Sequence, residues 1–280
     1  MAGDRALVLG GGGVAGIAWM TGLVAGLADA GQDITGADVI IGTSAGANVA
    51  AQIGSGLGLD ELFARQTDPA LQAAEIAAEL DLEKVGAEMA EFLAGASTPQ
   101  EALRLVGAWA LATHTVPEAA RRTVVESRLP SHQWPRRRIR LTAIDCATGQ
   151  LRVFDAQSGV SLVDAVAASS AVPGMWPPVT IGGRRYMDGG VRSMDNADLA
   201  QGFSRITVVS PLGLSSPVES PLALRDVVAR LREAGAQVSV TEPDQASVTA
   251  IGTNPLNPEV RAPAARAGRA QGRAGLPGSG

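Results

Sequence analysis

The sequence is poor in the residues that build disulfides and metal sites. Cys146 is its single cysteine among 280 residues, so the chain can form no internal disulfide and no cysteine-based metal site, which suits a reducing cytoplasm. It lies in the apolar run Ile139 to Ala147, where we expect a buried thiol. Acidic residues such as Asp145, Asp155 and Asp164 fall on different predicted elements without ligand spacing. We therefore expect no metal and no cofactor.

An excess of positive charge is also missing. The 23 lysine and arginine residues face 28 acidic ones, and the net charge of -5 gives no reason to expect nucleic acid as a partner. The basic run at 136–138 leaves peripheral membrane contact open. No pattern in the sequence assigns an oligomeric state.

A long unbroken apolar run is absent as well. The stretch Ala6 to Ala28 is apolar, but glycines at 10–13 interrupt it and Asp4 neutralises Arg5. We therefore expect a strand, a loop and a helix of a folded domain rather than a signal peptide or a membrane span. This favours a cytoplasmic protein.

What the sequence does contain is an alternation of strands and helices. Arg5 to Leu9 is a predicted strand, Val14 to Ala30 a helix that ends at Gly31, and Asp38 to Ile41 a second strand followed by another helix to about Ile53. This order predicts an α/β fold of three layers, α/β/α, with a mostly parallel central sheet.

The rest of the chain predicts one domain with a helical insertion. Apolar residues recur at helical spacing between about 60 and 128, and either core packing or a lid over an apolar cleft explains them. This main domain would cover 1–256, and a C-terminal helix with a disordered tail would cover 257–280. The individual predicted elements are helices at 71–80, 85–93, 103–111, 161–168 and 222–234, and strands at 139–147, 151–156, 179–186, 205–210 and 237–241.

The pentapeptide Gly42-Thr43-Ser44-Ala45-Gly46 directly follows the second predicted strand. A strand before, a helix after and glycine on both flanks are the context of a nucleophile elbow, in which a strained turn presents the serine hydroxyl at the carboxyl end of the strand. The N-terminus of the following helix favours negative charge that develops there. Ser44 is therefore the candidate nucleophile, and a serine N-cap is the structural alternative.

A glycine-rich loop follows the first predicted strand. Gly11, Gly12 and Gly13 offer consecutive unhindered amides, which suit an oxyanion or a phosphate, and Gly16 completes the pattern G-x-G-x-x-G. A dinucleotide-binding fold would need an acidic residue at the end of the second strand, and none stands after Ile41. The loop is therefore predicted to be an oxyanion hole.

The base that activates the serine is predicted to be a carboxylate. The two histidines, His114 and His132, precede several predicted strands, whereas the α/β-hydrolase order places histidine last. Asp188 is the leading candidate, because it follows a predicted strand and precedes Gly189 and Gly190, which allow close backbone approach. An Asp-Gly-Gly turn without catalytic function is the alternative.

In order and approximate spacing, these motifs resemble those of the patatin-like phospholipases, as does the small-residue block Ala168 to Pro173. The resemblance implies a Ser–Asp dyad without histidine and hydrolysis of the acyl esters of a lipid or a similar substrate. Ser44 would be the nucleophile, Asp188 the base and the glycine loop the oxyanion hole. The family commonly has a basic residue where Ala15 stands, and this difference bears on the preference for phospholipids.

A non-catalytic lipid- or nucleotide-binding module on the same fold is the alternative function. An activated hydroxyl distinguishes the two, because only an enzyme of this kind reacts covalently with a fluorophosphonate probe at Ser44.

Overall fold

A single mixed sheet forms the centre of the protein in a computed structural model, which describes residues 4–76, 87–88, 90–91, 94–214 and 222–275. Its strands are β1 (Arg5–Leu9), β2 (Val39–Gly42), β3 (Ile139–Asp145), β4 (Leu151–Phe154), β5 (Val179–Ile181), β6 (Arg184–Asp188), β7 (Arg205–Val209) and β8 (Gln237–Thr241). Their order is β5-β6-β3-β2-β1-β7-β8, with β4 paired to β3. The pairs from β3 through β2, β1 and β7 to β8 are parallel, and those of β3 with β4 and β6 and of β5 with β6 are antiparallel.

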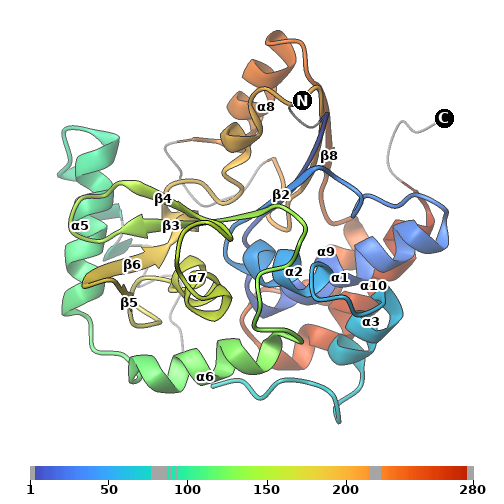
Figure 1. Cartoon of the computed structure of the whole chain (residues 1–280), viewed down its shortest axis with the longest axis horizontal. Coiled ribbons are helices and arrows are strands. Elements are labelled where there is room, and N and C mark those ends of the chain that lie inside the picture. The colour runs from blue at the N-terminus through green and yellow to red at the C-terminus, as the bar shows by residue number, and fades with distance from the viewer. Residues whose placement is uncertain (1–3, 77–86, 89, 92–93, 215–221, 276–280) are drawn as a thin grey trace.

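Helices cover both faces of this sheet (Figure 1). They are α1 (Gly13–Asp29), α2 (Ala45–Ile53), α3 (Leu59–Thr67), α5 (Pro99–Ala112), α6 (Glu118–Arg128), α7 (Leu162–Ser169), α8 (Leu224–Glu233), α9 (Gln245–Ile251) and α10 (Arg261–Arg273). Three short 3-10 turns, η1 (Gly189–Val191), η2 (Ala197–Ala200) and η3 (Pro258–Val260), complete the described elements.

The alternation of side chains along β1 explains the layers. Leu7 and Leu9 belong to the main core, which α1, α2, α7 and α10 cover, and Ala6 and Val8 belong to a second core under α8. Successive side chains of a strand point to opposite faces, so an uninterrupted apolar strand needs helices on both sides. The predicted three-layer α/β/α fold with a mostly parallel sheet is confirmed.

The structure divides one expected strand and contains a helix after β8 that was not expected. The expected strand over 179–186 is two strands, β5 and β6, because Gly182 and Gly183 both have positive φ, at 57° and 77°, and turn the chain into a hairpin. The sequence pattern did not predict α9. Its seven residues begin after Asp244, which caps the helix by accepting a hydrogen bond from the Ser247 amide.

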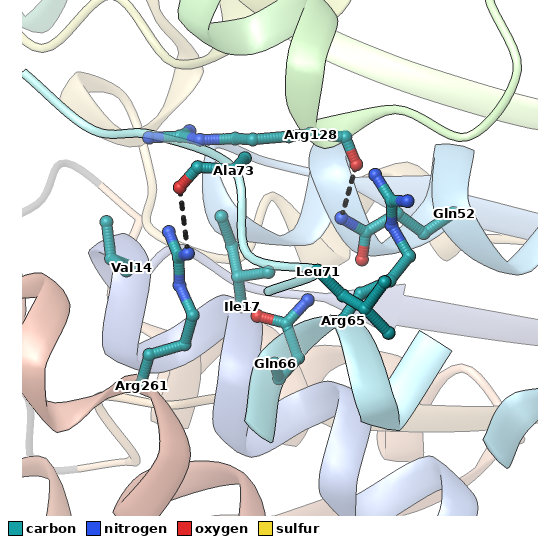
Figure 2. A pocket seen from close by; sticks show the side chains of 9 residues that line it. All are labelled: Val14, Ile17, Gln52, Arg65, Gln66, Leu71, Ala73, Arg128 and Arg261. Carbon is teal, nitrogen blue, oxygen red and sulfur yellow. Dashed lines mark hydrogen bonds between the residues drawn. The ribbon is translucent and has the colours of Figure 1, made fainter. Parts of the chain in front are cut away.

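Tertiary contacts decide the conformation after α3. Residues 71–76 are irregular, although a helix was predicted over 71–80; residues 77–80 and much of the predicted helix at 85–93 lie outside the described residues. The Ala73 carbonyl accepts a hydrogen bond from Arg261 of α10 (Figure 2), and the Gln72 side chain donates to the Gln66 carbonyl. These contacts with neighbouring elements replace the helical hydrogen bonds that the apolar spacing predicted.

Helix α10 is part of the same core as α1. Gly22 and Gly26 of α1 face α10 so closely that an added Cβ would overlap the carbonyl oxygens of Ala265 and Arg269, and Gly268 faces the Trp19 carbonyl in the same way. Glycine on both helices thus permits backbone-to-backbone packing. Within the described ranges, no helix is both long and apolar enough to cross a membrane.

Candidate active site

The pairing of β3 brings two strand ends together. Residues 141–144 of β3 pair with β4 on one edge, so β2 and β6 share the opposite edge. There Gly42, the last residue of β2, pairs with Leu141, while Asp188, the last residue of β6, pairs with Ala143. The strands approach from opposite directions, and their carboxyl ends meet. The loops after Gly42 and Asp188 are therefore neighbours.

Ser44 stands at a strained turn between β2 and α2. Its φ of 54° and ψ of -112° are rare for a residue with a side chain. Close packing holds the turn in place, because a Cβ on Gly46 would overlap the Leu9 carbonyl, and the Gly46 amide donates to the Gly10 carbonyl at 3.0 Å. Ser44 is 8% exposed and forms no side-chain cap on α2, so its hydroxyl is not the N-cap considered above.

Asp188 is buried beside this turn. Its Oδ1 accepts a hydrogen bond from the Gly190 amide at 2.7 Å. Burial raises the pKa of Asp188 to about 7, and the Gly190 amide, the Ser44 hydroxyl and the charge of Arg121 each lower it in part. Oδ2 has no hydrogen-bond partner of ordinary geometry among the described residues, and the interaction of the Asp188 carboxyl with Ser44 is looser than a full hydrogen bond, as in many unliganded active sites.

Asn196, which the sequence analysis did not single out, ties the two loops together. Its side-chain amide donates to Thr43 Oγ1 at 3.0 Å, next to Ser44, and to the Gly189 carbonyl at 3.2 Å, next to Asp188. Asn196 is fully buried and has a φ of 48°, a conformation that asparagine tolerates better than most residues. Its position follows no motif, so only the fold reveals it.

The small-residue block before β5 supports Ser44 from the other side. The Ser169 hydroxyl accepts a hydrogen bond from the Ser44 amide at 3.0 Å, and the Ser170 hydroxyl accepts one from Asn48 of α2, also at 3.0 Å. Larger residues would not fit here, since Ser169, Ser170 and Asn48 are all buried. The block thus fixes the start of α2 and the backbone of Ser44.

The glycine loop offers fewer amides than the sequence predicted. The Gly11 amide already donates to the Met194 carbonyl at 2.8 Å, so it is not available to an oxyanion. The amides of Gly12 and Gly13, at the start of α1, donate no hydrogen bond within the described part of the chain. Gly13 lines the same pocket as Ser44. The available donors are therefore the Gly12 and Gly13 amides.

The pocket that contains Ser44 is narrow. Its free volume is about 30 Å³, enough for one or two water molecules and far too small for an acyl chain. Its lining residues are Gly13, Val14, Ile17, Ser44, Ala45, Asn48, Glu75, Ile76, Arg121, Arg128, Ser170, Val172, Trp176 and Leu256. Neither histidine lines it. His114 and His132 are exposed, and His132 lies 3.6 Å from Glu126.

The family model of patatin-like phospholipases matches residues 7–200, a span that contains the glycine loop, the elbow and the Asp188 turn. The chain belongs to the patatin-like phospholipase family. The predicted resemblance is thereby confirmed.

Two solved structures of low sequence identity are similar to this patatin-like chain. The crystal structure of VipD from Legionella pneumophila matches with 14% identity and a TM-score of 0.48, covering 96% of this chain and 66% of VipD. The type III effector protein ExoU matches with 17% identity and a TM-score of 0.39, covering 97% of this chain and 53% of ExoU. The chain thus spans less than two thirds of either structure. No curated protein matches the sequence.

Proposed function

We propose that the protein is a serine acyl-ester hydrolase that uses a Ser44–Asp188 dyad and the amides of Gly12 and Gly13. The observation that carries the proposal is the strained Ser44 turn beside a buried carboxylate whose pKa is raised to about 7. An ordinary aspartate is a feeble base for a hydroxyl, and burial brings its pKa close to neutral pH, where general bases work best.

The reaction follows from these positions. Asp188 accepts the Ser44 proton while Oγ bonds to the acyl carbonyl carbon, and the negative charge that develops on the carbonyl oxygen lies at the Gly12 and Gly13 amides. The bond from carbon to the leaving oxygen then breaks, and that oxygen takes the proton from Asp188. Water, deprotonated by the same carboxylate, attacks the acyl-enzyme and releases the carboxylic acid and free Ser44.

Hydrolysis of a p-nitrophenyl ester tests the dyad. Ser44→Ala should lower the rate at least about 1,000-fold, because the nucleophile is lost, whereas a His114→Ala/His132→Ala double variant should keep the wild-type rate. Activity lost with the two histidines would falsify the dyad. A fluorophosphonate probe should label wild type and not Ser44→Ala. An unlabelled wild type would instead favour the non-catalytic binding module.

A further inference from the structure

One acidic side chain next to the Ser44 pocket faces three arginines. Glu75 pairs with Arg128 at 2.6 Å and with Arg261 at 2.5 Å, while Arg121 Nη1 is 3.9 Å away. The side chains of all four are 7% exposed or less. Figure 2 shows Arg128 and Arg261 in the adjoining pocket, which shares part of its lining with the Ser44 pocket. The cluster therefore holds more positive than negative charge out of contact with water.

Arg121 carries the unmatched part of this charge. Glu75 is within hydrogen-bond distance of Arg128 and Arg261, but Arg121 Nε and Nη1 are buried without a hydrogen-bond partner in the described ranges. Such donors are costly to leave unpaired. Burial, the largest cause, and the charge of Arg128 together lower the pKa of Arg121 to about 9, against the opposing effects of Glu75 and Asp188.

The orientation of Arg121 suits an anion at the edge of its guanidinium group. The guanidinium carbon lies 3.9 Å from the centre of the Trp176 ring, and both residues line the pocket that contains Ser44. Stacking on the ring occupies a face of the guanidinium and leaves the donors at its edge for an oxyanion, which Arg binds in a planar fork.

The chemistry of lipid esters narrows the choice of oxyanion. The ester that Ser44 attacks is uncharged, and a fatty-acid carboxylate appears only once it has been cleaved. A glycerophospholipid carries its phosphodiester on the same glycerol as the ester, so the phosphodiester comes close to the pocket whenever the ester reaches Ser44. The glycine loop has Ala15 and no cation of its own at this point, and Arg121 reaches the pocket from α6 instead.

We propose that Arg121 binds the phosphodiester of a glycerophospholipid while Ser44 attacks its acyl ester, an inference that rests on the proposed function. The phosphate would supply the partner that Arg121 Nε and Nη1 lack. Arg121 is then a specificity-determining residue that separates phospholipids from neutral lipid esters.

The test compares two substrates with the same acyl chains, a phosphatidylglycerol and a diacylglycerol, in detergent micelles. The measured quantity is the ratio of kcat/KM for the first to kcat/KM for the second. Arg121→Gln should lower this ratio about 10- to 100-fold, the loss expected for a hydrogen bond to a charged group. The ratio also cancels the effect of Arg121 on the pKa of Asp188 in the free enzyme, since that pKa enters kcat/KM for both substrates equally.

Two further variants sharpen the result. Arg122→Gln removes a charge one residue away, where Arg122 pairs with Asp164 and is 39% exposed, and should leave the ratio unchanged. Arg121→Lys keeps the charge without the planar fork and should give an intermediate ratio. Arg121→Gln should also melt no lower than wild type, because it removes a buried charge without hydrogen-bond partners at two of its nitrogens.

Several outcomes would overturn the inference. An unchanged ratio in Arg121→Gln and Arg121→Lys would do so while leaving the dyad standing, because the p-nitrophenyl ester would still be hydrolysed. Inorganic phosphate that inhibits p-nitrophenyl ester hydrolysis in wild type but not in Arg121→Gln, with the lipid ratio unchanged, would assign Arg121 to free phosphate instead. A wild type that neither hydrolyses any ester nor reacts with a fluorophosphonate would remove the proposed function itself, and this inference with it.

Discussion

Replacing Asp188 by asparagine should abolish activity and change how stability depends on pH. The carboxyl is buried, and its pKa is raised from 3.8 to about 7 in the folded protein. A carboxyl with a raised folded pKa keeps its proton where the unfolded chain has lost it, so wild-type stability falls as pH rises from about 4 to about 7. The side-chain amide of the Asp188→Asn variant cannot titrate, so the variant is spared this loss.

The magnitude follows from the two pKa values. Each pH unit between them is worth about 1.4 kcal/mol, so wild type should lose about 2–3 kcal/mol between pH 5 and pH 8 that Asp188→Asn does not lose. Burial also raises the pKa of Asp195 to about 7, but Asp195 titrates in both proteins and cancels in the difference. Any pH-independent effect of the new asparagine side chain on the free energy of unfolding cancels in the same way, because it is present at both pH values.

Urea unfolding of both proteins at pH 5, 6, 7 and 8 measures this difference. In parallel, kcat/KM of wild type for a p-nitrophenyl ester should rise with pH to a plateau, with its midpoint near 7, where Asp188 becomes ionised. Stability curves that stay parallel from pH 5 to pH 8 would refute the buried, neutralised carboxyl. A rate independent of pH over this range would remove Asp188 as the base.

Two further predictions concern the packing. Gly268→Ala should destabilise the protein by about 1–3 kcal/mol in urea unfolding, because the new Cβ would overlap the Trp19 carbonyl, although alanine is the better helix former. The control variant Ala270→Gly, at an exposed position of the same helix, should lose about 1 kcal/mol. A stabilised Gly268→Ala would contradict the close packing of α1 and α10. Cys146, whose pKa is raised to about 12 by burial, should react with a thiol-specific disulfide reagent only in denaturant, so rapid labelling of the native protein would show that its thiol is accessible.

The parts of the fold that depend on local pattern could be predicted from the sequence. Local residue patterns predict the two turns of the site. They are the apolar strand before Ser44 with the glycines on both sides of this serine, and the Asp-Gly-Gly turn at Asp188. Which strands pair is visible only in the fold: β2 and β6 both pair with β3, and this pairing places the Ser44 and Asp188 motifs next to each other.

The supporting residues could not be predicted, because their roles depend on distant parts of the chain. Asn196 acts through Thr43, which precedes it by 153 residues, and Glu75 lies in a stretch whose spacing predicted a helix. The Gly11 amide looked available in the sequence, and only the position of Met194 shows that it is occupied. At these positions, hydrogen bonds to distant parts of the chain decide the local structure, and the spacing of neighbouring residues does not reveal them.

The raised pKa of Asp188 and the unmatched charge of Arg121 are coupled through the same pocket. Burial disfavours the charged form of each group, and each favours the charged form of the other. An anion bound at Arg121 would offset the field that lowers the pKa of Asp188. The carboxylate would then become a stronger base when a phospholipid is present than when a neutral ester is present. The arginine would thus select the substrate, and the phosphate that it binds would restore the basicity that the charge of Arg121 takes from Asp188.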